Sequence, residues 1–414
     1  MTTLSRMIPG LVKRSSAIAL AASAFLTALA LPAAAQTFRR EAYNPAILSL
    51  AFNEESRPSA EGKPQTTAFL DVTLIGRQGD PVGRRVQLSR ERFGAELRKL
   101  YQQIARQQSL NLSDPASPAR QLHDALIAPV EPLLRQQGIT TLLIAADRGL
   151  QAVPFAALHD GSSYFGQRYA FSITPSVRFT SLGPPRTGSQ RLLAAGASSF
   201  KGLAPLPLVP QEIQGLATER PADQFLNQAF TPQVLLSQAA DSRYDRVHVA
   251  SHADFQPGGP SKATLHTGGG TITLPQFLAM RERRQGEPLE LFSLSACRTA
   301  LGDSDTELGF AGLALQAGAR SAIGTLWYVD DVATSAYFLQ LYRYLDSGIP
   351  KAEALQATRS AMIDGRVRLQ GDRVIGADGK PLLKNLTSVQ QRRVASGMSN
   401  PFFWSGIELL GTPW

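Results

Sequence analysis

The sequence predicts an α/β fold with a mostly parallel central sheet, and two observations carry this prediction. Six short runs are apolar at both odd and even positions, the pattern of strands buried on both faces of a sheet. Helical patterns separate most of these runs, as in chains that alternate strands and helices. The runs lie at residues 141–146, 192–196, 247–250, 291–294, 321–327 and 405–410. With 43% hydrophobic residues in a chain of 414, a large core is possible, and about 150 residues per domain predicts two or three units.

The first 35 residues have the features of an export signal peptide. An apolar stretch at residues 17–31 is preceded by three basic residues and no acidic residue. The three alanines at residues 33–35 form a small-residue cleavage site. The apolar stretch is short for a membrane span. We therefore expect a mature chain that begins at Gln36, is exported to the periplasm or the extracellular space, and has no transmembrane span. An uncleaved amphipathic anchor is the alternative.

A small α+β region is predicted at residues 36–114. Residues 68–75 have the pattern of a strand and are followed by a Gly-Asp-Pro turn, with residues 86–88 as a candidate partner strand. Ser89 is a candidate N-cap for an amphipathic helix that ends at about Gln108.

The main domain is expected to span residues 115–414. Its second half predicts a helix rich in Ala and Gly at residues 310–319, a helix capped by Asp330 or its neighbour, and a third helix at residues 351–362. The polar and basic segment at about residues 365–400 has no clear periodicity, so we interpret it as an insertion or a mobile loop.

Composition and motifs exclude several classes of function. The net charge of +9 is spread over scattered basic residues that are not interleaved with aromatics, so no nucleic-acid site is indicated. A single cysteine excludes internal disulfides. The sequence has no G-x-S-x-G nucleophile elbow, phosphate loop, dinucleotide fingerprint or H-E-x-x-H zinc helix. We therefore expect no cofactor and no metal.

Cys297 and His252 form the most informative pair. Cys297 follows the apolar run 291–294, in the stretch LELFSLSACRTALGD, and His252 follows the run 247–250. Reactive groups in parallel sheets gather beyond the carboxyl ends of the strands, so neighbouring strands would bring the thiol and the imidazole together. Histidine is the usual base for a cysteine nucleophile near neutral pH.

Each of these residues also has a structural explanation. Cysteine is often a small buried hydrophobe, and Cys297 alone would be compatible with that role. His252 alone would more often be a hydrogen-bonded structural histidine. His248, on the same predicted strand, is better explained as part of the core or as support for the site.

Six motifs in order resemble the CHAT domain, a branch of the caspase-like cysteine peptidase clan. They are HVASHA at residues 248–253, LSACRTALGD at 294–303, GLA with AGARS at 312–321, GTLWYVDD at 324–331, KAEAL at 351–355 and NPFFW at 400–404. Residues 144–158 and 173–176 resemble the opening half of the same domain. The tetratricopeptide repeats that often precede this domain are not found, so the chain looks like an exported form without them.

The resemblance implies a caspase-like three-layer sandwich, with His252 as general base and Cys297 as nucleophile. It also implies that the backbone N–H groups of Cys297 and Ala253 hold the oxyanion. The position of Ala253 is often Gly in the clan, and alanine keeps the N–H while adding a methyl group.

Three acids, Asp303, Asp305 and Glu307, follow the cysteine. They do not fit a calcium loop, because Leu308 stands where Gly is needed. By analogy with clan members that prefer Arg or Lys, Asp303 or Asp305 could receive a basic P1 side chain. The alternative is an ordinary solvated acidic loop.

The resulting hypothesis is an exported cysteine endopeptidase that cleaves a protein or peptide substrate through an acyl-enzyme. The first alternative is a non-catalytic or dormant CHAT module that acts in protein interaction or signalling at the cell envelope. A structural envelope protein with an accidental thiol is the second.

Overall fold

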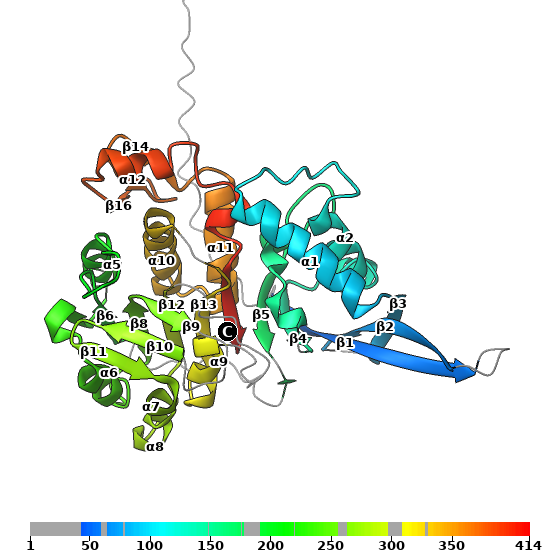
Figure 1. The fold of residues 1–414 in the computed structure, drawn as a ribbon, viewed down its shortest axis with the longest axis horizontal. Coiled ribbons are helices and arrows are strands. Elements are labelled where there is room, and N and C mark those ends of the chain that lie inside the picture. Colours follow the sequence, from blue (N-terminus) through cyan, green and yellow to red (C-terminus); the bar gives the residue numbers. More distant parts are fainter. Residues whose placement is uncertain are drawn as a thin grey trace, which may run out of the picture. The chain divides into compact units, whose positions relative to one another are not determined.

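A mixed sheet of eleven strands runs through the computed structural model (Figure 1). The model describes residues 43–58, 64–77, 79–147, 149–174, 176–177, 191–218, 220–255, 263–296, 309–327 and 330–414. The strands, in the order of the sheet, are β3 (Val82–Gln87), β2 (Pro64–Ile75), β1 (Pro45–Pro58), β4 (Thr141–Ala146), β5 (Ala170–Thr174), β17 (Ile407–Gly411), β13 (Ser321–Thr325), β12 (Leu291–Ser295), β8 (Arg246–Ala250), β6 (Leu192–Gly196) and β7 (Ala222–Leu226).

The sheet contains two groups of parallel strands. Strands β13, β12, β8, β6 and β7 are parallel to one another, and β1, β4 and β5 form a second parallel group. β17 joins the groups, because it pairs antiparallel with β13 and parallel with β5. The predicted mostly parallel sheet is therefore present, and its central strands are buried on both faces, as their continuous apolar runs indicated.

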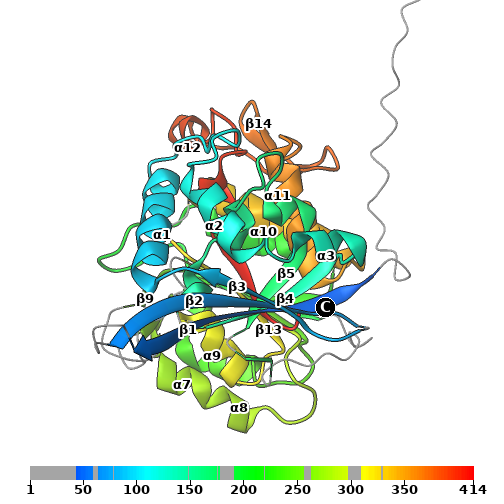
Figure 2. The same ribbon diagram turned by 90° about the vertical axis from the view of Figure 1, so that its right-hand side faces the viewer.

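Helices cover both faces of the group that contains β8 and β12, which gives three layers (Figures 1 and 2). One face carries α5 (Val209–Leu216) and α10 (Asp331–Asp346), and α11 (Lys351–Ile363) lies beside α10 over β5 and β17. The other face carries α6 (Pro232–Gln238), α7 (Leu274–Leu278), α8 (Met280–Arg283) and α9 (Gly309–Gln316). Asp330 caps α10, accepting hydrogen bonds from the backbone N–H groups of Val332 and Ala333 as the sequence predicted.

The N-terminal strands extend the central sheet. β1 and β2 form a long antiparallel pair, β3 adds to β2, and β1 pairs in parallel with β4. Ser89 caps α1 (Arg90–Ala105), as expected. The sequence did not indicate β1, because its second half is polar and exposed and breaks the apolar pattern. Three further helices follow: α2 (Pro118–Leu126), α3 (Glu131–Gln136) and α4 (Phe165–Arg168).

The segment that we interpreted as an insertion or a mobile loop contains regular structure. It folds into a small antiparallel sheet and a short helix, and it packs on α10, where the backbone N–H of Ala377 donates to Gln340 Oε1 at 2.8 Å and Arg343 pairs with Asp378 at 2.7 Å. The elements are β14 (Arg368–Gln370), β15 (Arg373–Ile375), β16 (Pro381–Leu383) and α12 (Ser388–Arg393).

The helices are of moderate length. The longest in the described part of the chain, α1 and α10, have 16 residues each. In that part, none has both the length and the apolar character needed to cross a membrane.

Candidate active site

The pairing of β8 with β12 brings the two sequence motifs to the same edge of the sheet. The strands are parallel and Ala250 lies opposite Ser295, the last residue of each strand. The backbone N–H of Ser251 then donates to the carbonyl of Ser295 at 3.3 Å, so the pairing continues past the strand ends. His252 is two residues beyond this row, and in the sequence Cys297 is also two residues beyond it.

The chain is held in place up to the residue before the cysteine. Buried Thr325, the last residue of β13, donates its hydroxyl to the carbonyl of Ala296 at 2.7 Å. Cys297, Asp303 and Asp305 lie outside the described residues. Ala296 is therefore the last described residue before the candidate nucleophile, and a buried side chain fixes its carbonyl.

The imidazole of His252 has a partner that determines its tautomer. Its Nε2 lies 2.8 Å from the carbonyl oxygen of Ala204. A carbonyl oxygen can only accept, so Nε2 carries the proton and, in the neutral ring, Nδ1 has the free lone pair. The ring of Phe200 packs on the imidazole with its centroid 4.7 Å away. His252 thus has the protonation pattern that a general base requires.

A small sheet fixes the backbone around His252. Its strands are β9 (Ala253–Phe255), β10 (Ala263–Thr267) and β11 (Gly270–Thr273). The N–H of His266 in β10 donates to the carbonyl of His252 at 2.9 Å, and Ser251 Oγ donates to the carbonyl of His266 at 2.6 Å. The candidate base and the residue before it are therefore both held by β10.

Ala253 lies directly opposite Leu265 in this small sheet. Hydrogen-bonded and non-hydrogen-bonded pairs alternate in antiparallel strands. Because the neighbouring pair, His252 with His266, is hydrogen-bonded, Ala253 occupies a non-hydrogen-bonded position. Its N–H consequently points away from β10. Because β9 is the edge strand of the small sheet, no further described strand of that sheet lies on this side.

Sequence reasoning missed three groups around His252. The acceptor for Nε2 is a backbone carbonyl, which every residue carries, so no side-chain pattern marks Ala204. Phe200 lies just after β6, and His266 pairs with Asp254 at 2.8 Å while also contacting the edge of Phe200. An acid directly after the HVASHA motif and a histidine further along the chain were the only available signal for this pair.

His248 is a core residue, which confirms its interpretation as structural support. It is fully buried on β8, and its Nε2 lies 2.8 Å from Glu212 Oε1 of α5. Ser335 of α10 donates to the other oxygen of Glu212 at 2.6 Å. This network joins β8 to two covering helices and so anchors the strand that presents His252.

The described residues contain no group of three or more His, Cys, Asp or Glu side chains that could hold a metal ion. The chemistry that this edge can support is proton transfer by an imidazole, together with backbone hydrogen-bond donation.

The chain is similar to one protein family and to several solved structures. The model of the CHAT domain family matches residues 116–412. No curated protein matches the sequence. The separase chain of a Saccharomyces cerevisiae separase–securin complex matches 90% of this chain with 10% identity and a TM-score of 0.51, and the match covers 30% of the separase chain. The Arg-specific cysteine proteinase gingipain R matches 70% of this chain with 10% identity and a TM-score of 0.42.

The family match covers most of the chain and includes both strand-end motifs. The similarity to separase concerns the fold alone. The predicted caspase-like α/β fold is therefore confirmed, and the chain belongs to the CHAT domain family.

Proposed function

We propose that this chain is a cysteine endopeptidase in which His252 activates Cys297. The observation that carries the proposal is the register of β8 and β12, in which the base and the candidate nucleophile follow paired strand ends by the same two residues. The hydrogen bond from Nε2 to Ala204 supports it, because it leaves Nδ1 as the proton acceptor.

The proposed reaction has two halves. His252 Nδ1 takes the thiol proton, and the thiolate of Cys297 attacks the carbonyl carbon of the scissile peptide bond. The N–H groups of Ala253 and Cys297 stabilise the oxyanion. When the tetrahedral intermediate collapses, the imidazolium gives its proton to the leaving amine. Water, deprotonated by His252, then hydrolyses the thioester and restores the thiol.

Two parts of the proposal rest on the sequence alone. A basic P1 side chain would be received by Asp303 or Asp305, and the leader at residues 1–35 would direct the chain out of the cytoplasm. Matched peptide substrates with Arg, Lys or Leu at P1 test the first part, because a preference for Leu would contradict it. N-terminal sequencing of the protein from the producing cell tests the second.

The central test is labelling by a peptidyl acyloxymethyl ketone, measured by intact mass and peptide mapping. We expect one adduct at Cys297, and we expect His252→Ala to lower the second-order rate constant by about 10²–10⁴-fold. His266→Gln is the matched control, because it alters the other partly exposed histidine of the site and should change the rate by less than about tenfold.

Two results would contradict the peptidase proposal. One is labelling at the same rate in the wild-type protein and in His252→Ala. The other is peptide cleavage that persists in Cys297→Ala. Selective binding of partner proteins without any labelling would instead favour the dormant module.

A further inference from the structure

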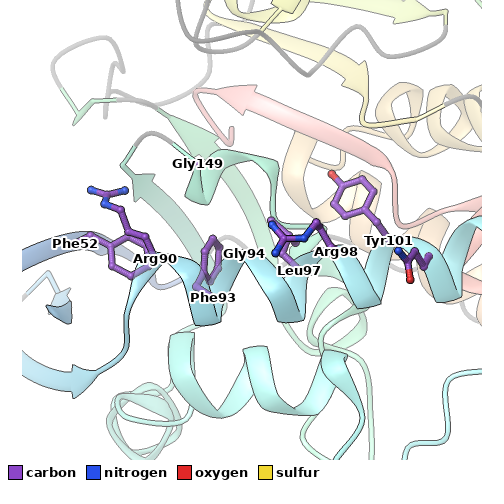
Figure 3. Close-up of a pocket in the computed structure, with 9 residues that line it drawn as sticks. Phe52, Arg90, Phe93, Gly94, Leu97, Arg98, Tyr101 and Gly149 are labelled. Carbon is purple, nitrogen blue, oxygen red and sulfur yellow. The ribbon is translucent and has the colours of Figure 1, made fainter.

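A groove beside α1 has no role in the chemistry proposed above. It has a volume of about 570 Å³ and runs along one face of the helix, opposite Gly149 (Figure 3). This volume lies in the range of about 300–1,000 Å³ that is typical of ligand sites. The lining side chains repeat at helical spacing along α1: Arg90, Phe93, Leu97, Arg98, Tyr101 and Gln102, with Phe52 of β1 at one end.

The lining of the groove combines apolar surface with positive charge. Phe52 and Phe93 pack edge to face, with ring centroids 5.4 Å apart, and Leu97 and Tyr101 remain partly exposed. Arg90 places its guanidinium over the ring of Phe52 at 4.6 Å, and exposed Arg98 has no ion pair with any described residue. None of the residues that line the groove is acidic. A ligand with an apolar side chain and neighbouring carboxylates would match both features.

The groove is connected to the candidate active-site edge. Tyr101 donates its hydroxyl to the carbonyl of Ala152 at 2.7 Å, and its ring contacts the ring of Trp327 edge to face at 5.6 Å. Trp327 follows Thr325 by two residues, at the end of β13, just as His252 follows Ala250 at the end of β8. Tyr101 of the groove therefore packs on the carboxyl end of β13, in the same sheet edge as the end of β8 that carries the base.

We infer that this groove docks a segment of the protein substrate in which an aromatic or aliphatic residue is flanked by Asp or Glu. The inference rests on the peptidase function proposed above and extends it to the substrate. The apolar side chain lies against Phe93, Leu97 and Tyr101, and the carboxylates face Arg90 and Arg98. The two arginines make the association faster and stronger at low salt.

Fluorescence anisotropy with a labelled peptide tests the inference. The probe is fluorescein-Gly-Ser-Glu-Asp-Phe-Glu-Asp-Ser-Gly, and the protein is the full chain with Cys297→Ala, so that no cleavage occurs. We expect saturable binding that weakens with salt. Replacing the peptide Phe by Ala, or the protein substitution Arg98→Glu, should each raise Kd on the order of tenfold. Arg92→Glu is the matched control, since Arg92 is exposed on the same helix outside the groove, and it should leave Kd unchanged.

Three outcomes overturn the docking site. Equal affinity for a probe with Lys in place of the acids excludes charge recognition, and an unchanged Kd in Arg98→Glu excludes this groove. A dimer detected by light scattering that Arg98→Glu dissociates assigns the groove to a second copy of the chain. Labelling of Cys297 in the wild-type protein separates this inference from the peptidase proposal: labelling without peptide binding removes only the docking site, whereas binding without labelling removes the peptidase.

Discussion

The two ends of the parallel strands around β8 and β12 hold their polar groups in different ways. At the amino ends, charged side chains are paired with opposite charges. Lys351, at the start of α11, lies 2.5 Å from Glu290, which immediately precedes β12, and Arg320, just before β13, lies 3.5 Å from the same carboxylate. Arg220 pairs with Asp346, and Arg246 lies 3.6 Å from it.

At the carboxyl ends, polar groups are bound mainly by neutral partners. His252 binds the carbonyl of Ala204, and Thr325 binds the carbonyl of Ala296. An opposite charge on Nε2 would stabilise the imidazolium, whereas a neutral carbonyl orients the ring and leaves Nδ1 able to accept a proton. Under the proposed function, the charge pairs at the amino ends of these strands contribute stability and the carboxyl ends contribute reactivity, and substitutions can separate the two.

The largest effect on stability is expected for Lys351→Ala. The side chain of Lys351 is nearly buried, and burial lowers its pKa to about 8. The lysine is still protonated at pH 7, and its removal leaves the carboxylate of Glu290 without its nearest partner. We expect the free energy of unfolding in urea to fall by about 3 kcal/mol. The labelling rate at Cys297 in the folded variant should stay unchanged.

Lys99→Ala is the matched control for this prediction. It removes an exposed lysine that pairs with Glu96 at 2.8 Å on α1, and it should cost less than about 0.5 kcal/mol. A loss below about 1 kcal/mol for Lys351→Ala would contradict the role assigned to the amino-end charges.

A pH-dependent effect is expected two residues further along α11, at Glu353. Burial raises the pKa of Glu353 to about 7, although the Thr141 hydroxyl donates to Oε1 at 2.5 Å. Its unfolded pKa is about 4.5, so between pH 4.5 and 7 the native state binds more protons than the unfolded state. The stabilising contribution is complete below pH 4.5 and is lost as the pH rises through 7.

Glu353→Gln removes this dependence, because glutamine does not titrate. We therefore expect the wild type to lose roughly 3 kcal/mol relative to the variant between pH 4.5 and pH 7.5. Urea unfolding of both proteins at several pH values measures the difference. Glu54→Gln, at an exposed position of β1, is the control and should follow the wild type. A constant difference between wild type and Glu353→Gln would contradict the prediction.

The sequence predicted those parts of the fold that depend on continuous local patterns. Strands buried on both faces appear as apolar runs, and the caps Ser89 and Asp330 carry the side chains that caps require. β1 was missed because half of it is polar, and its place in the sheet depends on long-range pairing with β4. The small sheet within residues 365–400 was missed because its three strands have only three residues each.

The same distinction applies to the candidate site. The strand-end positions of His252 and Cys297 could be found from motifs, and the register of β8 with β12 agrees with them. The acceptor of the Nε2 proton of His252 could not be found in this way, because it is a backbone carbonyl and every residue has one. Glu212, which binds His248, is distant in sequence, and the sequence of its helix α5 does not indicate that the helix packs against β8.

A smaller change in stability than those of Lys351→Ala and Glu353→Gln is expected for Thr325→Val, at the carboxyl end. The substitution preserves the shape of the side chain but removes the hydrogen bond to the carbonyl of Ala296, so the free energy of unfolding should fall by about 1 kcal/mol. Thr358→Val is the matched control, because buried Thr358 donates to the carbonyl of Ala354 within α11 at 2.8 Å, away from the site. Both variants should lose similar stability. Only Thr325→Val should slow labelling of Cys297, by about three- to tenfold, because the carbonyl that Thr325 binds belongs to Ala296, the residue before the nucleophile. Equal labelling rates in the two variants would show that the carboxyl end of β13 contributes to stability alone. That result would contradict, for β13, the assignment of reactivity to the carboxyl ends of the strands.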